Sequence, residues 1–273
     1  MNPYSFMLDE SQWIWSFSRL TTYDRCPYGF YLQYIKQLEQ EENAFAQYGS
    51  FMHELLEKYA KDEILIFELL DEYKKKYNEK VTHDFPPNKY VILADTYYEN
   101  GENYFSEFEG FNDYEMLEVE KEVHFKIDKY PFVGYIDLIA KNKDGEIEVI
   151  DHKSKKLSQP RKSTWEDIKK RRKSELYEYL RQLYIYCIPL IEQEKIEPKY
   201  LCFNSFRENK FIKIPFDKED YEESKQWALN IIKQIYADEY MDVTYDNDFF
   251  CDYICGVRHY CPSSNKFLGE IVE

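Results

Sequence analysis

Apolar residues recur at intervals of three and four through the first 110 residues of the chain, and this period predicts helices. Residues 18–38 begin at serine and threonine, which commonly cap helices, and residues 50–77 continue the same period. Residues 88–110 predict a further helix that ends at a glycine. The N-terminal part of the chain is therefore expected to be helical.

The pattern changes to that of strands after residue 113. Extended runs occupy residues 114–127, 131–140 and 146–153. Turn-forming sequences, Asp128-Lys129 and then "NKDG", separate them, which favours an antiparallel meander. The remaining elements are expected in the order helix, two strands and closing helix, at residues 175–193, 198–206, 210–216 and 218–240.

This order of elements predicts an α+β (mixed α/β) fold, with a central mixed sheet flanked by helices. We expect one domain over residues 1–273. Within it we distinguish a helical N-terminal region (1–112), a core (113–240) and a cysteine-bearing tail (241–273).

A formal net charge of −16 and a pI near 4.9 exclude attraction of nucleic acid by the whole surface. Binding of a polyanion then requires a local basic patch. Residues 153–173, the basic segment, hold ten lysines and arginines against Glu166 and Asp167. Such a run is either a solvated face or a contact for the DNA backbone. No apolar run approaches the ~20 residues of a membrane span, so we expect no membrane partner and a cytoplasmic location.

Two acids and a lysine are expected to meet at the ends of two neighbouring strands. In "IEVIDHKS", Asp151 and Lys153 share a face because alternate residues of a strand point the same way. Asp137 ends "VGYID" on the preceding strand, where hairpin pairing brings it close to Asp151. Carboxylates suit Mg²⁺ or Mn²⁺, which lower the pKa of a bound water that a lysine can orient. The alternative is a surface salt bridge at a strand end.

"GYID" followed by "IEVIDHKS" resembles the motif of the PD-(D/E)xK nuclease superfamily, specifically of its RecB-like branch. "GSFMHELLEKY" resembles the Gly-x-x-x-His helix of that branch, with Gly49 and His53 at the motif positions. "RQLYIYC" resembles its Gln-x-x-x-Tyr helix, with Gln182 and Tyr186, and "FSRLTTYDRCPYGFYLQY" resembles its N-terminal signature. The resemblance runs over residues 18–261 and implies a restriction-endonuclease-like core.

The resemblance also implies metal-dependent hydrolysis of DNA phosphodiester bonds. It assigns the Mg²⁺ or Mn²⁺ ligands to His53, Asp137, Asp151 and the backbone carbonyl of His152. Lys153 would serve the attacking water, with Gln182 and Tyr186 supporting the site. A glutamate of the first strand, Glu118 or Glu120, is expected near the active end, and the sequence does not choose between them.

One cysteine precedes the predicted core and three follow it: Cys26, Cys251, Cys255 and Cys261. By spacing alone the tail cysteines could bind zinc, with His259 able to replace one of them, or be unrelated thiols.

The arrangement resembles the RecB-like families with an iron–sulfur cluster, including AddB-type nucleases and CRISPR-associated RecB-like exonucleases. In those families four such cysteines ligate a [4Fe-4S] cluster, which we therefore expect here in preference to zinc. The families usually have two residues between the first two tail cysteines, whereas three separate Cys251 from Cys255. Cys187 and Cys202 lie in apolar surroundings and are expected to pack in the core.

The basic segment starts at the expected catalytic lysine, which favours contact with DNA phosphates beside the metal. The expected DNA-binding residues are Lys155, Lys156, Arg161, Lys162, Trp165, Lys169, Lys170, Arg171 and Arg172. Trp165 could stack on a base.

We hypothesise from these features a DNA exonuclease that acts on single-stranded ends in recombination, repair or phage DNA processing, with endonuclease activity also open. One alternative is a CRISPR-adaptation nuclease that trims spacer precursors with integrase partners. Another is a catalytically silent DNA-binding scaffold. No helicase motor is encoded, so any unwinding would come from a partner. A phage-encoded protein would work in the host cytoplasm.

Overall fold

The computed structural model describes residues 13–157, 175–238, 241–243 and 247–269. By their contacts, the residues of the chain form two compact units. The first, here called the cysteine unit, comprises Met1–Asn43, His124–Val133 and Glu223–Glu273. The second, the sheet unit, comprises Ala44–Val123 and Gly134–Glu222. Each is described by itself.

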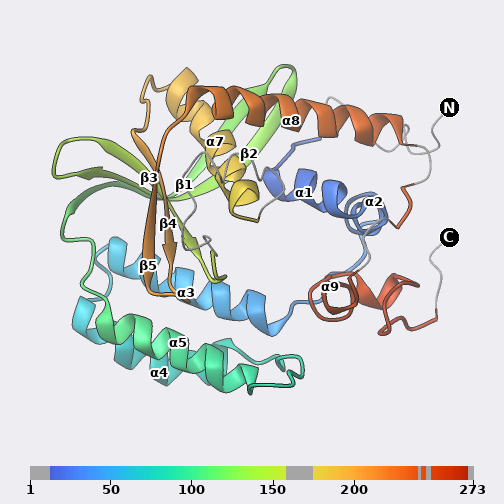
Figure 1. Cartoon of the computed structure of the whole chain (residues 1–273), viewed down its shortest axis with the longest axis horizontal. Helices are drawn as coiled ribbons and strands as arrows, with labels where there is room; N and C mark the ends of the chain where they lie inside the picture. Colours follow the sequence, from blue (N-terminus) through green and yellow to red (C-terminus); the bar gives the residue numbers. More distant parts are fainter. Residues whose placement is uncertain (1–12, 158–174, 239–240, 244–246, 270–273) are drawn as a thin grey trace. The chain divides into compact units, whose positions relative to one another are not determined.

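A five-stranded mixed sheet carries the polar residues of interest (Figure 1). Its strands follow chain order: β1 (Tyr114–Ile127), β2 (Tyr130–Asn142), β3 (Ile147–Lys153), β4 (Tyr200–Ser205) and β5 (Lys210–Pro215). β2 pairs antiparallel with β3, β3 parallel with β4, and β4 antiparallel with β5. The expected mixed sheet flanked by helices is confirmed, with the helix expected at 175–193 serving as the crossover between β3 and β4.

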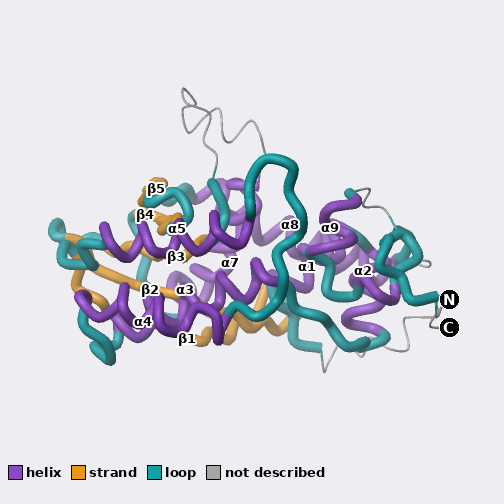
Figure 2. Tube along the Cα trace, turned by 90° about the horizontal axis from the view of Figure 1, so that it is seen from below, coloured by secondary structure: helices purple, strands orange, loops and turns teal. Residues whose placement is uncertain are grey.

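The helices of the sheet unit form two groups. In the residues that the structure describes, its helices are α3 (Ala44–Ala60), the 3₁₀ turn Ile66–Glu68, α4 (Leu69–Lys80), α5 (Leu93–Glu107) and the crossover helix α7 (Glu175–Glu192). α4 packs on α3 and beside α5 (Figure 2), and a core of tyrosines and phenylalanines fills the space between these three. α7 instead contacts β3. The many aromatic residues of this unit mainly build its core.

The helix expected over residues 18–38 is broken in the structure. α1 (Phe17–Arg25) ends at Cys26, α2 (Pro27–Phe30) begins directly after it, and a π-helical stretch (Tyr31–Ile35) follows. Cys26 is extended (φ −152°, ψ 102°), as proline disfavours the helical region for the residue before it, and Pro27 occupies the first turn of α2, where its missing N–H costs least. The helical region expected over residues 18–38 therefore consists of separate helices on the two sides of Cys26.

Besides the N-terminal helices and residues His124–Val133, the cysteine unit contains the C-terminal part of the chain. α8 (Lys218–Ala237) begins in the sheet unit and continues here. α9 (Asp248–Tyr253) carries Cys251, Cys255 lies between α9 and the 3₁₀ turn Arg258–Tyr260, and Cys261 directly follows that turn. Arg258 is buried, and its guanidinium donates to the backbone carbonyls of Glu41, Glu42 and Cys255. In the described part of the chain, no helix is both long and apolar enough to cross a membrane.

Candidate metal centre

Asp137 and Asp151 are brought together by the pairing of β2 with β3. The register places Leu138 opposite Ile150, so the next pair along the ladder sets Asp137 beside Asp151. The backbone N–H of His152 donates to Asp137 Oδ2 at 2.7 Å, which fixes the orientation of that carboxylate. The two acids thus lie side by side, as the strand pattern predicts.

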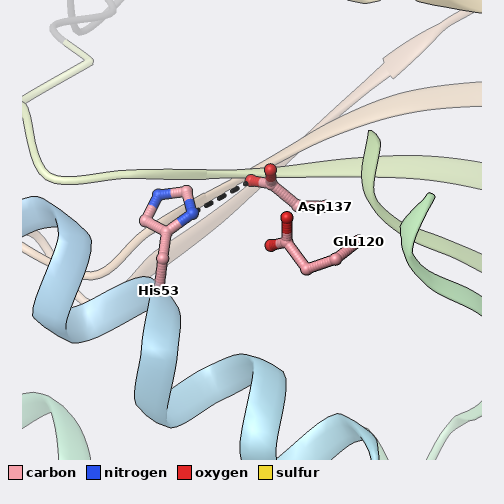
Figure 3. Close-up of side chains that lie close together, drawn as sticks. All are labelled: His53, Glu120 and Asp137. Carbon is pink, nitrogen blue, oxygen red and sulfur yellow. Dashed lines mark ion pairs between the residues drawn. The ribbon is translucent and has the colours of Figure 1, made fainter. Parts of the chain in front are cut away.

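His53 reaches the same place from the middle of α3. Its Nε2 lies 2.9 Å from the backbone oxygen of His152, and its Nδ1 lies 3.5 Å from Asp137 Oδ2 (Figure 3). A carbonyl oxygen only accepts hydrogen bonds, so Nε2 carries a proton, and Nδ1 is the ring nitrogen that faces the carboxylate. Nδ1 is therefore the atom that could bind a metal beside Asp137. The His152 carbonyl, expected as a metal ligand, is here the acceptor that orients His53.

Glu120 of β1 completes a group that could hold a metal. Ligand atoms of His53, Glu120 and Asp137 all lie within 4.8 Å of one another, and the Glu120 carboxylate points towards that of Asp137 in Figure 3. Glu120 is a left-handed residue within the strand (φ 50°). Burial, reinforced by the Asp137 and Glu57 carboxylates, raises the pKa of Glu120 to about 7. Clustered acids of this kind favour a divalent cation between them.

Glu118, the other candidate on β1, has a different partner. Its carboxylate is half exposed and lies 3.5 Å from Lys121 Nζ. The structure therefore favours Glu120, a choice that no sequence signal makes, because the positive φ that redirects the strand is not readable from the residue type.

Asp151 and Lys153 form a nearly buried ion pair next to this group. Lys153 Nζ lies 2.7 Å from Asp151 Oδ2, with side-chain exposures of 15% and 9%. Burial and the neighbouring Asp137 raise the pKa of Asp151, against the opposing effect of Lys153. Asp151 is not in the three-residue group of ligand atoms within 4.8 Å. Its carboxylate faces the lysine instead.

The side chain of His152 points to the face of the sheet opposite to that of Asp151 and Lys153. Its Nδ1 lies 3.0 Å from Asn204 Nδ2, and Asn204 in turn donates to the Tyr104 hydroxyl at 2.7 Å. Burial lowers the pKa of His152 to about 3, so its ring is neutral. The residue contributes to the site through its backbone, and its ring belongs to the core.

α7 supplies the expected glutamine and tyrosine. Gln182 Oε1 accepts a hydrogen bond from Lys153 Nζ at 3.2 Å. The ring of Tyr186 lies against Gly134, where an added Cβ would be 2.5 Å from a ring carbon. Burial raises the pKa of Tyr186 to about 12, and the negative charges of Asp151 and Asp137 act in the same direction. The glycine of "VGYID" is therefore required for the close approach of this tyrosine.

The glycine of the α3 motif also has a packing role. A Cβ on Gly49 would lie 3.3 Å from Ser154 Oγ, in the residue that follows Lys153. Close contact between α3 and the end of β3 thus depends on the absence of a side chain at that position.

The four cysteines at the two chain ends line a single cavity of about 200 Å³ within the cysteine unit: Cys26, Cys251, Cys255 and Cys261. All four are free thiols. Burial raises the pKa of Cys255 to about 11, and the other three sulfurs act in the same direction. Cys26 caps α2, and its Sγ accepts a hydrogen bond from the Gly29 N–H at 3.4 Å.

The spacing of these sulfurs bears on what they could bind. No three of the four lie within 4.8 Å of one another, whereas the sulfurs of a tetrahedral zinc site are about 3.8 Å apart. A four-iron cluster holds its thiolates farther apart, because each binds a different iron. His259 is directed elsewhere: its Nε2 pairs with Glu41 at 2.5 Å and its Nδ1 lies 2.8 Å from the Lys266 carbonyl oxygen. The four thiols therefore share one cavity without forming a compact group of three sulfurs, and the His259 side chain is paired elsewhere.

The remaining sequence-derived candidates divide into two groups. Cys187 and Cys202 are buried, and the Cys202 thiol donates to Glu148 at 3.2 Å. Of the expected DNA-binding residues, Lys155 and Lys156 are exposed, and the others lie outside the described residues: Arg161, Lys162, Trp165, Lys169, Lys170, Arg171 and Arg172.

A metal-binding group of two carboxylates and an imidazole, set beside an Asp-x-Lys strand end on a mixed sheet, is the arrangement of a metal-dependent nuclease. A family model described as "PD-(D/E)XK nuclease superfamily" matches residues 14–262. The chain belongs to that superfamily of nucleases.

Comparison with individual proteins adds little to this assignment. No curated protein matches the chain. Fourteen chains of solved structures do match. One of them, titled "Crystal structure of SSO0001", shares 18% sequence identity over 79% of this chain and 97% of its own length, with a TM-score of 0.32.

Proposed function

We propose that this protein is a Mg²⁺- or Mn²⁺-dependent DNA exonuclease that acts at single-stranded ends. The observation that carries the proposal is the convergence of His53, Glu120 and Asp137 beside the Asp151–Lys153 pair. Membership of a nuclease superfamily supports hydrolysis of phosphodiester bonds. Preference for single strands and for ends rests on the sequence resemblance.

Each residue of the group has a distinct role in this proposal. His53 Nδ1, Glu120 and Asp137 would hold the ion, and Asp151, which now faces Lys153, would be the further carboxylate available to it. When bound, a divalent ion would supply polarisation of a phosphate and a lowered pKa of a bound water. Asp137 keeps its orientation because the His152 N–H remains bonded to it.

The surroundings of Lys153 support a role as a hydrogen-bond donor during hydrolysis. Its ammonium lies among two oxygen acceptors and is 15% exposed, so it can donate to a water or to a developing negative charge on phosphate. Gln182 holds the ammonium in place when Asp151 turns towards the ion.

We further propose that Cys26, Cys251, Cys255 and Cys261 bind a [4Fe-4S] cluster. The cavity that all four cysteines line supports this assignment. The three-residue spacing between Cys251 and Cys255 is compatible with it, since the short helix α9 and the turn after it still direct both thiols to the cavity.

The direct test is a nuclease assay with Mg²⁺ or Mn²⁺ on 5′- and 3′-labelled single strands and on closed single-stranded circles. We expect mononucleotides or short products from linear strands, none from circles, and no cleavage in EDTA. Cleavage of circles would replace the exonuclease by an endonuclease. No metal-dependent cleavage of any strand would leave a DNA-binding scaffold and overturn the proposal.

The site is tested with Asp151→Ala and Lys153→Ala. Each should lose at least about 100-fold in activity, because general acid–base and electrostatic groups contribute effects of that order. Asp144→Ala, an exposed acid in the turn between β2 and β3, is the matched control and should cleave normally. Circular dichroism should show the same fold in all three variants. Full cleavage by either site variant would remove the assignment.

A further inference from the structure

Besides Asp151 and Gln182, a third side chain lies against the ammonium of Lys153. The ring centroid of Tyr179 lies 4.7 Å from Lys153 Nζ. Asp151 Oδ2 is 2.7 Å away and Gln182 Oε1 is 3.2 Å away. An ammonium has three N–H donors and no acceptor, so two oxygens and one aromatic face give it a defined set of neighbours.

The position of Tyr179 follows from the helix that carries it. Tyr179, Gln182 and Tyr186 are separated by three and four residues, so they share one face of α7. Tyr186 packs on Gly134, and Gln182 bonds Lys153. Two contacts with the strands thus hold the same helical face that presents the Tyr179 ring.

An aromatic face suits this position for electrostatic reasons. The ring attracts a cation within about 6 Å of its centroid, and the attraction strengthens when water is largely excluded, as it is at Lys153. A ring adds no negative charge to a site that already holds Glu120, Asp137 and Asp151. Among the residues that the structure describes, Asp151 and Gln182 are the oxygen acceptors of this ammonium, and the ring adds no further acceptor that would compete with the substrate.

We propose that Tyr179 is a positioning residue that holds the Lys153 ammonium at the metal centre through the face of its ring. This role rests on the proposed function, in which Lys153 serves hydrolysis. The lysine side chain has four rotatable bonds, and the ring restricts them when Asp151 turns away to the ion. Without the ring, Gln182 alone would hold the ammonium, and the reactive orientation would be populated less often.

The main competing role is contact with DNA. Lys155 Nζ lies 6.0 Å from the same ring, and Lys155 is exposed in the basic segment. If Tyr179 acted mainly on substrate binding, its loss would raise KM and leave kcat unchanged. If it positions Lys153, its loss lowers kcat and leaves KM nearly unchanged.

The test compares Tyr179→Leu with Tyr179→Phe in the full-length protein. On a labelled single strand with Mn²⁺, we expect Tyr179→Leu to lower kcat by about threefold to thirtyfold, with KM within about twofold. Tyr179→Phe keeps the ring and should stay near the wild type. Tyr200→Leu is the matched control, since it removes another lysine–tyrosine contact, that of Lys213, whose Nζ is 4.1 Å from the Tyr200 ring. This control should not change kcat.

A second measurement does not depend on activity. In protein labelled with ¹³C-lysine, the Cε signal of Lys153, identified by its loss in Lys153→Arg, should show an aromatic ring-current shift. That shift should disappear in Tyr179→Leu and persist in Tyr179→Phe.

The two measurements separate the possible failures. An inactive wild type would overturn the proposed function, while the lysine signal would still decide whether the ring holds Lys153. An unmoved signal in Tyr179→Leu, an unchanged kcat, or an effect confined to KM would each overturn the positioning role. Melting temperatures of both variants within a few degrees of the wild type would exclude misfolding as the cause.

Discussion

Glu120 combines a left-handed backbone, partial burial and a cluster of neighbouring acids, a costly combination for a single residue in a strand. Such costs persist where the surrounding structure imposes them, and they concentrate at functional sites. A bound divalent ion would offset the repulsion among Glu120, Asp137 and Asp151. The residue should therefore control both metal affinity and the pH dependence of stability.

The free energy of unfolding of the metal-free protein should fall as the pH rises, because of Glu120. Its pKa is raised from 4.5 to about 7 in the fold, so its contribution is full below pH 4.5 and is lost as the pH rises through about 7. In urea unfolding with EDTA, the wild type should lose about 1–2 kcal/mol more than Glu120→Gln between pH 5 and pH 8, a value reduced for solvent screening. Equal losses in both proteins would contradict the assignment.

Metal binding gives an independent test of Glu120. By calorimetry at pH 8, Glu120→Gln should bind Mn²⁺ about tenfold or more weakly than the wild type, since a carboxylate ligand is replaced by a neutral amide. Glu118→Gln is the matched control, because Glu118 pairs with Lys121 on the same strand. The same loss of affinity in both variants would point to general charge rather than to ligation.

The close contact between Gly134 and the Tyr186 ring leads to a separate prediction. A methyl group there would collide with the Tyr186 ring, so Gly134→Ala should destabilise the protein by about 1–3 kcal/mol and reduce cleavage. In a Tyr186→Ala background the collision is absent, and the added cost of Gly134→Ala should fall below about 1 kcal/mol. A cost that is the same in both backgrounds, measured by urea unfolding, would show that the clash is not the cause.

Among the elements, the crossover helix α7 and the break between α1 and α2 each contribute to one of the two candidate sites. α7 presents Tyr179, Gln182 and Tyr186 to two strands from one face. The break at Cys26 and Pro27 turns a cysteine out of what would be a continuous helix and lets it cap α2. Neither arrangement requires a long insertion. The shared face of α7 needs only helical spacing, and the break at Cys26 needs only the proline that follows it.

The proposed iron–sulfur cluster would join α2 to α9. Protein purified without oxygen should be brown, with an absorption shoulder near ~400 nm and about four iron atoms per chain. Cys26→Ser should lose most of the iron and lower the melting temperature, since the cluster joins segments far apart in the chain. Cys187→Ala, a buried cysteine outside the cavity, should keep its iron. Stoichiometric zinc without iron would replace the cluster by a zinc site.

For the whole molecule, a charge of −16 has to be reconciled with a polyanionic substrate. If the local basic segment binds the DNA backbone, as proposed from the sequence, binding should weaken steeply with salt. If about five cations contact a single strand, the slope of log K against log salt is about −3.5, and Lys155→Ala with Lys156→Ala should reduce it by about 1.4. Fluorescence anisotropy with the inactive Asp151→Ala protein measures this. A slope unaffected by the double change would place the DNA elsewhere.

The local pattern of residues was enough to predict which neighbouring side chains share a face. Alternation along "IEVIDHKS" determines that Asp151 and Lys153 share a face, and helical spacing determines that Gln182 and Tyr186 do, because side-chain direction follows the backbone period. The break at Cys26 could also have been predicted from Pro27, since the restriction that proline places on its neighbour is local.

Only the tertiary structure decided which distant residues meet. It selected Glu120 over Glu118 through a left-handed φ that residue type does not reveal, and it brought the Tyr179 ring to Lys153 through a crossover helix. It also gathered four cysteines from both chain ends around one cavity. Such meetings depend on how helices pack against the sheet and on the course of the backbone between them, which no local sequence period records.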